Sequence, residues 1–279
     1  SLGTDVTMFN ERVNLTVDLY RKKTDPLVAA ITTPSSIGVK SVMMNMGQLK
    51  TDGIEVTLKV SPIYRPQDRF VWNISLNGTH AKSKYSKIGN RLQSMNEQNQ
   101  ANLNTTRYYD GGSPTDIWAV RSAGIDPATG QDLFIKKDGT YTFTYDKNDE
   151  VVVGNTEPKL EGVLGTTLYY KGLSFGCYLR YRLGGQVFNN ALYEKVENID
   201  REGINYNQDK RALYDRWSTP GQEAKFKRIS LFQTTETSSR FVMDENTLSV
   251  NVARLRKKLD GAGLAGFITT KIGAGYLVE

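Results

Sequence analysis

The sequence predicts a mainly β fold: an antiparallel transmembrane β-barrel segment, incomplete and therefore an open sheet, followed by a short C-terminal helix and a hairpin. Three observations predict it. Long stretches alternate apolar and polar residues, as strands with one dry and one wet face do. Short turns and long loops connect them in an asymmetric way. The alternation stops near residue 250. Because alternation does not say whether the dry face meets lipid or protein, a large soluble β-sandwich is the alternative.

The regular strands come first. In "RVNLTVDLY" the residues Val13, Leu15, Val17 and Leu19 share one face, and the residues between them share the other. The same pattern recurs at residues 54–61, 70–77 and 173–183. These strands are about ten residues or longer, whereas strands of globular proteins typically run about 5–6 residues. Their polar faces carry charged residues, so we expect those faces to be in contact with water.

The connections differ in length. Short turns are expected at residues 9–12, 64–69 and 170–172, and long polar loops at 24–48, 90–116 and 189–220. Short turns on one side and long loops on the other are typical of an outer-membrane barrel. Aromatic residues near strand ends would suit an interfacial girdle; they are Tyr20, Tyr64, Phe70, Trp72, Tyr169, Tyr170 and Phe188.

Composition narrows the function classes. The 279 residues include one cysteine (Cys177) and one histidine (His80), which we interpret as ordinary side chains on strand faces. Metal clusters and histidine-based catalytic constellations are therefore disfavoured, and we expect no enzyme activity, no cofactor and no metal. The first residues contain no apolar run of a signal peptide, so the chain is either not exported or an internal piece of a longer exported protein.

Nine segments resemble, in this order, the C-terminal portion of the SusC/RagA family of TonB-linked outer-membrane transporters over about residues 1–249. They are "YRKKTDPLV", "PSSIGVKS", "NMGQLKTDGIEVTL", "AGIDPATGQDLF", "VVGNTEPKLEG", "YYKGLSF", "YRLGGQVFN", "LYDRWSTPGQ" and "TSSRFVMDENTLS". The resemblance implies part of a large plugged β-barrel in the outer membrane of a Gram-negative, Bacteroidota-like cell. It also implies import of glycans or peptides, a surface lipoprotein lid of the SusD type, and an energy-coupling TonB complex as partners. The plug domain and the energy-coupling box are not found in these 279 residues, so we expect the chain to be inactive alone.

Tyr108, Tyr109 and Trp118 are the candidate substrate-binding residues, since they lie in or beside a long polar loop. Aromatic faces stack on sugar rings or on peptide side chains, and neighbouring Asn and Asp residues can hydrogen-bond the same ligand. The alternative is that these rings only pack the loop. The nearby "IDPATGQ" is interpreted as a turn, in which Pro127 and Gly130 set the bends.

The C-terminal tail departs from the strand pattern. Val252, Leu255 and Leu259 follow helical spacing. From about residue 245 to 279 the sequence resembles the recognition helix and wing of an OmpR/PhoB-type winged-helix response regulator, with Thr270, Gly273, Gly275 and Tyr276 at the wing positions. Ile272 departs from that family, where a basic residue commonly precedes the glycine. A basic helix can lie in the DNA major groove and neutralise phosphates; the candidate DNA-binding residues are Arg254, Arg256, Lys257, Lys258 and Lys271.

We therefore divide the chain into a partial outer-membrane β-barrel (residues 1–249) and a partial winged-helix-like tail (residues 250–279). We interpret the chain as a chimera of two incomplete parts that meet near residues 244–251. A divergent barrel end is the alternative for the tail. A DNA-binding module, with a cytoplasmic location, is the alternative function; otherwise the partners are outer-membrane lipid and the transported glycan or peptide.

Overall fold

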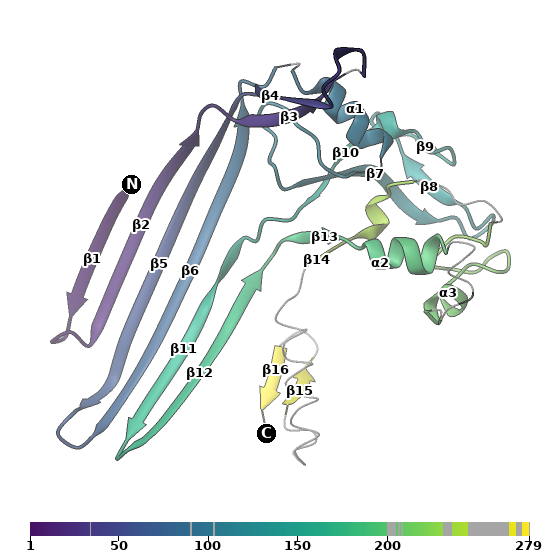
Figure 1. Cartoon of the computed structure of the whole chain (residues 1–279). Coiled ribbons are helices and arrows are strands. Elements are labelled where there is room, and N and C mark those ends of the chain that lie inside the picture. Colours follow the sequence, from purple (N-terminus) through teal and green to yellow (C-terminus); the bar gives the residue numbers. More distant parts are fainter. Residues whose placement is uncertain are drawn as a thin grey trace.

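A computed structural model describes residues 1–33, 35–89, 91–102, 104–199, 205, 207, 209–230, 236–244, 268–271 and 275–278. Two parts of different construction make up most of it: a tall six-stranded sheet and a compact layer of loops at one of its ends (Figure 1). We call them the wall and the loop layer.

The wall is an open antiparallel meander in which each strand pairs with the next wall strand along the chain. Its strands, in spatial order, are β1 (Leu2–Met8), β2 (Val13–Thr24), β5 (Gln48–Arg65), β6 (Phe70–Ser86), β11 (Leu160–Tyr170) and β12 (Leu173–Leu183). Four of them have the predicted length of about ten residues or more: β2 has 12 residues, β5 18, β6 17 and β12 11. The predicted open, mainly β architecture is thus confirmed.

The pairing register gives the wall one apolar and one polar face. Residues that pair across strands point to the same side of a sheet, and successive residues point to opposite sides. One continuous apolar row crosses all six strands, through Val6, Leu15, Leu58, Leu76, Leu164 and Leu179. The next row, on the other face, is mostly polar and runs through Asp5, Thr16, Thr57, Asn77, Val163 and Arg180.

The short turns all lie at one end of the wall, and the long connections lie at the other (Figure 1). The β11–β12 turn has only two residues, Lys171 and Gly172, both with positive φ (46° and 97°). Left-handed backbone at both central positions is what a tight type I′ hairpin requires. The predicted asymmetry of turns and loops is therefore confirmed.

The predicted aromatic girdle is only partly correct. Phe70, Trp72 and Tyr170 lie on the apolar face at the turn end, where the rings of Phe70 and Tyr170 are 5.2 Å apart. Tyr20, Tyr64 and Tyr169 fall on the polar face by register, since each lies one residue out of step with the apolar row. Phe188 packs in a core of the loop layer instead. Alternation along a strand, rather than distance from its end, decides which rings face outward.

The loop layer consists of residues 25–47, 87–159 and 184–244, as far as they are described. Its largest sheet has the order β10-β7-β8-β9. Its elements are β3 (Val28–Thr32), η1 (Ser35–Ile37), β4 (Ser41–Asn45), α1 (Gln93–Ala101), β7 (Asp116–Ile125), β8 (Asp132–Ile135), β9 (Tyr141–Thr142), η2 (Lys147–Asp149), β10 (Glu150–Asn155), β13 (Gln186–Phe188), α2 (Asn190–Leu192), the π-helix η3 (Tyr193–Glu197), α3 (Arg211–Tyr214), η5 (Ser239–Phe241) and β14 (Val242–Asp244). None of the described helices has the length and apolar character to span a membrane.

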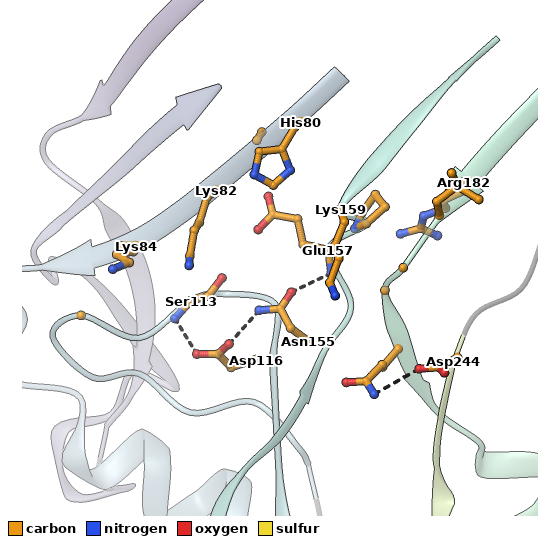
Figure 2. A pocket seen from close by; sticks show the side chains of 17 residues that line it. His80, Lys82, Lys84, Ser113, Asp116, Asn155, Glu157, Lys159, Arg182 and Asp244 are labelled. Carbon is orange, nitrogen blue, oxygen red and sulfur yellow. Dashed lines mark hydrogen bonds between the residues drawn. The ribbon is translucent and has the colours of Figure 1, made fainter. Parts of the chain in front are cut away.

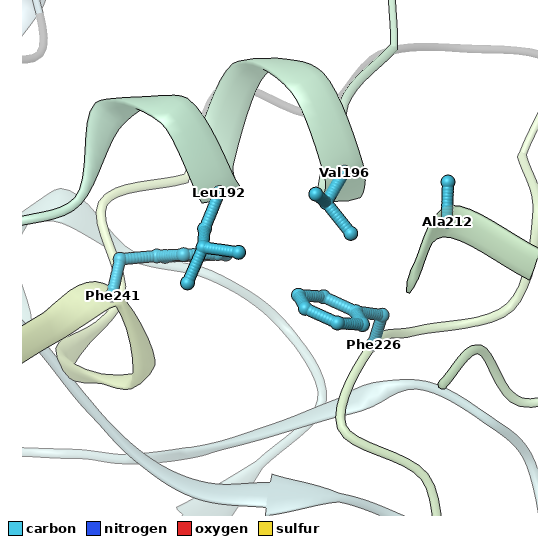
Figure 3. Packing of buried hydrophobic residues seen from close by; sticks show 5 residues of the cluster. All are labelled: Leu192, Val196, Ala212, Phe226 and Phe241. Atoms are coloured by element: carbon cyan, nitrogen blue, oxygen red, sulfur yellow. The ribbon is translucent and has the colours of Figure 1, made fainter. Parts of the chain in front are cut away.

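Two buried clusters hold the loop layer together. Leu192, Val196, Ala212, Phe226 and Phe241 form the first, where α2, η3, α3 and η5 converge (Figure 3). The second consists of Met46, Tyr85, Ile88 and Leu92. Tyr85 pairs with Leu49, and both lie on the polar face of the wall by register. The loop layer therefore folds over the polar face and leaves the apolar face uncovered.

At the C-terminus, β15 (Ile268–Lys271) pairs antiparallel with β16 (Gly275–Val278). This agrees with the predicted hairpin. The predicted recognition helix, with Arg254, Arg256, Lys257 and Lys258, lies outside the described residues.

Candidate functional site

The three aromatic residues singled out in the sequence line one pocket of about 390 Å³ in the loop layer. Trp118 stands on β7 and Tyr109 in the preceding loop, with their ring centroids 5.3 Å apart. Tyr109 is 46% exposed, so one ring face is available to a ligand. Two adjacent rings, one of them open to solvent, form a surface on which a flat apolar face can stack.

Tyr108 has a more structural position. Its ring lies 5.7 Å from that of Tyr85 and packs against the second buried cluster. Its backbone is held by Asn96 of α1, whose side-chain amide donates to the Tyr108 carbonyl (2.9 Å) and accepts from the Tyr108 N–H (2.7 Å). Tyr108 thus lines the pocket while it anchors the loop to α1.

A buried ion pair forms the base of this pocket. Arg107 and Glu150 are 2.6 Å apart, with side chains 3% and 4% exposed. Glu150 also accepts from Gln100 (3.2 Å) and from the hydroxyl of Thr237 (3.3 Å). The two side chains of such a buried, hydrogen-bonded pair stay together, because separating them would leave an uncompensated charge in the interior. The pair is therefore rigid. The aromatic rings are therefore held on a fixed support.

The rim of the pocket offers polar groups of several kinds. Amides, cations and one carboxylate line it; they are Gln93, Asn96, Glu97, Gln100, Lys137, Lys147 and Asn148. A stacking surface ringed by hydrogen-bonding groups can bind a sugar ring or a peptide segment.

A larger pocket, of about 820 Å³, lies where β6 and β11 separate near the loop layer (Figure 2). Its lining includes charged and polar side chains from the ends of these two strands: His80, Lys82 and Lys84 at the end of β6, and Glu157 and Lys159 just before β11. One side of the pocket is fixed by Asp116 of the loop layer, which accepts from the Ser113 N–H (2.7 Å) and the Asn155 amide (2.7 Å). Burial raises the pKa of Glu157, while the Ser83 backbone N–H and the charges of His80 and Lys82 oppose that rise. Sequence reasoning missed this pocket, because its residues come from five separate segments.

The "IDPATGQ" segment is a turn, as predicted. The Asp126 carboxylate accepts from the hydroxyl and the backbone N–H of Thr129, which lowers the pKa of Asp126. Gly130 has φ +69°, and a Cβ there would come within 2.4 Å of the Trp217 ring. The Trp217 indole N–H donates to the Pro127 carbonyl (2.8 Å). Trp217 therefore packs on this turn. The contact joins "AGIDPATGQDLF" to "LYDRWSTPGQ", two of the nine segments that resemble the transporter family, and sequence spacing does not reveal it.

A second buried ion network ties the C-terminal part of the loop layer to its sheet. Arg240 lies 2.8 Å from Asp132 and 2.9 Å from Glu197. Burial alone would lower the pKa of Arg240, but the charges of Glu197 and Asp132 outweigh it and the pKa is raised. Arg216, buried beside them, donates to the carbonyls of Ala212 and Lys227. The Arg240 pairs fix η5 relative to β8 and η3.

Among the described residues, no group of three His, Cys, Asp or Glu side chains has the geometry to hold a metal ion. His80 lies at the larger pocket and Cys177 is exposed on β12. Of the candidate DNA-binding residues, only Lys271 lies in the described part, where β15 pairs it with Gly275.

Several known proteins are similar to this chain. It is 27% identical over 263 residues to TonB-dependent receptor P3 of Formosa agariphila, a match that covers 87% of this chain and 25% of that protein. TonB-dependent receptor SusC of Bacteroides thetaiotaomicron is 23% identical over 213 residues, covering 72% of this chain and 20% of that protein. The chain thus spans about a quarter of the length of these relatives. A shorter match, 50% identical over 52 residues, is to the sensory transduction protein BceR of Bacillus subtilis; it covers 19% of this chain and 22% of that protein.

A solved structure has the same fold. The RagAB peptide transporter superposes with a TM-score of 0.67 at 22% identity, covering 87% of this chain and 26% of that chain. The family model described as TonB dependent receptor-like, beta-barrel, matches residues 1–189, more than half of the sequence. The strand order, the two-faced register and this match agree, and the chain belongs to the TonB-dependent receptor-like β-barrel family.

Proposed function

We propose that this chain is the loop-bearing wall portion of an outer-membrane importer of glycans or peptides, driven in the complete protein by TonB energy coupling. The observation that carries the proposal is the two-faced wall. Its apolar row crosses six strands without interruption, as a lipid-facing surface does, while the loop layer folds over the polar, lumen-facing side. Similarity to receptors that include SusC supports it.

The partners follow from the same resemblance. A surface lipoprotein lid of the SusD type would meet the loop side, and the outer-membrane lipid would surround the apolar face. With about a quarter of its relatives' length, the chain is expected to bind ligand without transporting it. For the complete protein the proposed role is ligand capture and import, not catalysis. The matched relatives are named receptors.

Tyr109 and Trp118 are the residues we propose to contact the transported ligand, with Tyr108 holding the loop in place. Calorimetric titration of the detergent-solubilised chain with neutral oligosaccharides and with oligopeptides tests this. Tyr109→Ala and Trp118→Ala should each weaken binding roughly tenfold, because one aromatic contact contributes about 1 kcal/mol or more. Tyr141→Ala is the matched control, since Tyr141 is an exposed tyrosine (65%) on β9 that does not line the pocket. Unchanged binding in both pocket variants would contradict the assignment.

A second candidate, DNA binding through the tail, is favoured by the β15–β16 hairpin and by the short BceR match. Duplex binding should then weaken steeply as salt rises, because cations released from DNA phosphates drive the association. Loss of Arg254, Arg256, Lys257, Lys258 and Lys271 by alanine substitution should abolish the gel shift. A chain ending at residue 244 that retards DNA as well as the full chain would refute this candidate. Contiguous sequencing through the codons for residues 235–260 would establish whether one locus encodes both parts.

A further inference from the structure

Five cations gather on the apolar-face side of the wall at its loop end; we call them the outer basic patch. They are Arg21, Lys23, Lys50, Lys82 and Lys84, and all are exposed. Register puts them together: Arg21 pairs with Asp52 and Asp52 with Lys82, while Lys23 pairs with Lys50 and Lys50 with Lys84. The patch thus extends over β2, β5 and β6 as two adjacent rows.

The packing of the neighbouring residues indicates the side of the sheet on which these cations lie. Leu49 and Tyr85, which alternate with Lys50 and Lys84, turn inward to the second buried cluster, and Tyr85 is only 7% exposed. Residues on either side of an inward residue in a strand point outward. By register the outer basic patch therefore lies on the same side of the sheet as Leu58 and Leu76. On β6, Lys82 and Lys84 also border the pocket between this strand and the loop layer.

Its height on the wall is equally defined. Leu19 pairs with Ile54, and the first row of the patch begins two residues further along each strand. At about 3.3 Å per residue, the two rows lie roughly 7 to 13 Å beyond this last apolar pair. Because barrel strands tilt by about 35–45°, these distances correspond to roughly 5 to 10 Å of height. The first row therefore falls within the polar headgroup layer, which is about 5 to 8 Å thick on each side of the bilayer core. At the turn end the same face carries three aromatic residues, Phe70, Trp72 and Tyr170, and one cation, Arg65, which pairs with Phe70. Aromatic rings rather than a cluster of cations therefore mark that boundary.

The patch keeps a net positive charge, although Lys50 lies near the Asp52 carboxylate and Lys82 near that of Glu157. Arg21 lies 2.5 Å from Asp52, and Lys23 lies 2.8 Å from Asp25. Lys50, Lys82 and Lys84 make no ion pair with any residue that the structure describes. Lys82 and Lys84 also line the 820 Å³ pocket, together with His80 and Lys159 (Figure 2). The carboxylates that line this pocket are Asp116, Glu157 and Asp244, and Asp116 is already bound by Ser113 and Asn155.

We infer that the outer basic patch and the adjoining pocket bind the phosphate-bearing headgroup of an anionic lipid in the leaflet on the loop side. Lysine ammonium groups are effective phosphate ligands, and cations at the membrane surface attract anionic headgroups. Anchored acyl chains would lie along the apolar row below, which places the headgroup at the height of the lysines. The inference rests on the proposed membrane location of the wall.

The test uses the full 279-residue chain in zwitterionic detergent, with phosphatidic acid, phosphatidylcholine or inorganic phosphate added, and native mass spectrometry to count bound lipid. Phosphatidic acid should be retained and phosphatidylcholine should not. The triple variant Lys50→Gln, Lys82→Gln, Lys84→Gln should weaken retention at least about tenfold, because each surface lysine contributes several-fold. The charge-preserving triple variant Lys50→Arg, Lys82→Arg, Lys84→Arg should retain the lipid.

A matched control removes the same charge from the opposite face: Lys22→Gln, Lys59→Gln, Arg180→Gln, all on the polar face by register. It should bind phosphatidic acid normally. Equal binding by the patch variant and the control, or displacement of the lipid by millimolar inorganic phosphate, would overturn the inference. Insertion into bilayers tests the membrane location separately. A chain that inserts into phosphatidylcholine bilayers with or without phosphatidic acid, and retains no phosphatidic acid, refutes only the lipid site, whereas one that inserts into neither bilayer refutes the proposed function as well.

Discussion

Leu76 and Leu164 in the middle of the wall remain 40% and 42% exposed, whereas Ile88 and Phe241 in the loop layer are 1% and 2% exposed. Both regions come from one chain of ordinary composition, but they remove apolar surface from water in different ways. The loop layer packs its side chains on one another. The wall pairs its backbone groups and leaves the apolar face to the surroundings, which is stable only where the surroundings are lipid.

The two regions are stabilised by different interactions. In the wall, hydrogen bonds between strands satisfy the backbone, and side chains add a two-sided pattern. In the loop layer, irregular backbone is held by buried ion pairs such as Arg107–Glu150 and by aromatic clusters. We therefore expect the wall to respond to changes in its lipid surroundings, and the loop layer to the loss of its buried ion pairs.

The largest effect should follow removal of the membrane mimic. Diluted out of detergent, the 279-residue chain should aggregate, because within the described residues β1 and β12 have no partner on their outer edges and no element covers the apolar face. Light scattering and size-exclusion chromatography measure the outcome. A monomeric, cooperatively folded protein in plain buffer would contradict the assignment of the wall to a bilayer.

Arg240→Ala should damage the loop layer and spare the wall. It leaves the buried carboxylates of Asp132 and Glu197 unpaired, and breaking such a pair costs about 3–5 kcal/mol. Hydrogen exchange should speed up in β8 and η5 while β5 stays protected. Arg21→Ala, which breaks an exposed pair in the wall, is the control and should change neither. Equal exchange in β5 and β8 would show that the two regions unfold as one unit.

Leu58→Arg should have the opposite regional effect. Leu58 sits in the apolar row, and a cation at the bilayer midplane of a barrel strand costs about 2–4 kcal/mol. Thr57→Arg, one residue away on the polar face, should cost little because that face meets water. Denaturant titration in lipid vesicles compares the two variants; similar losses would mean that the face assignment is wrong.

The smallest effect concerns acid. The Asp110 carboxylate accepts from the backbone N–H groups of Ile88 (2.8 Å) and Gly89 (3.1 Å), which lowers its pKa. A carboxyl with a lowered folded-state pKa stabilises above its unfolded pKa and loses that contribution as pH falls through the folded value. The protection factors of the Ile88 and Gly89 amides, which correct for the intrinsic pH dependence of exchange, should therefore fall below about pH 4. Asp110→Asn should show low protection factors already at neutral pH, and protection factors in the native chain that do not change with pH would contradict this account.

Much of the wall was predictable from the sequence. Alternation in residues 13–19, 54–61, 70–77 and 173–183 predicted four strands and their faces, and all four are confirmed. A period of two is a local property, so it can be read without knowing the partners of a strand. β1 and β11 are less regular and did not stand out, and the girdle was misassigned where distance from a strand end was used instead of register.

The candidate site was predictable only in part. Tyr108, Tyr109 and Trp118 were singled out by residue type and loop position, and they line one pocket. The supporting Arg107–Glu150 pair joins residues 43 apart in the chain, and the larger pocket draws on five segments. No local signal marks such contacts, because a buried ion pair needs only that two distant segments fold together.

By itself, then, the sequence determined the strand pattern, the asymmetry of turns and loops, and the family of the wall, since each depends on neighbours along the chain. Only the tertiary structure decided that Trp217 sits on the turn at Pro127 and that Arg240 reaches Asp132, across 90 and 108 residues. It also decided which face of the wall the loops cover, and so which lysines face outward. Those choices depend on packing and desolvation between remote segments, which have no period for the sequence to display.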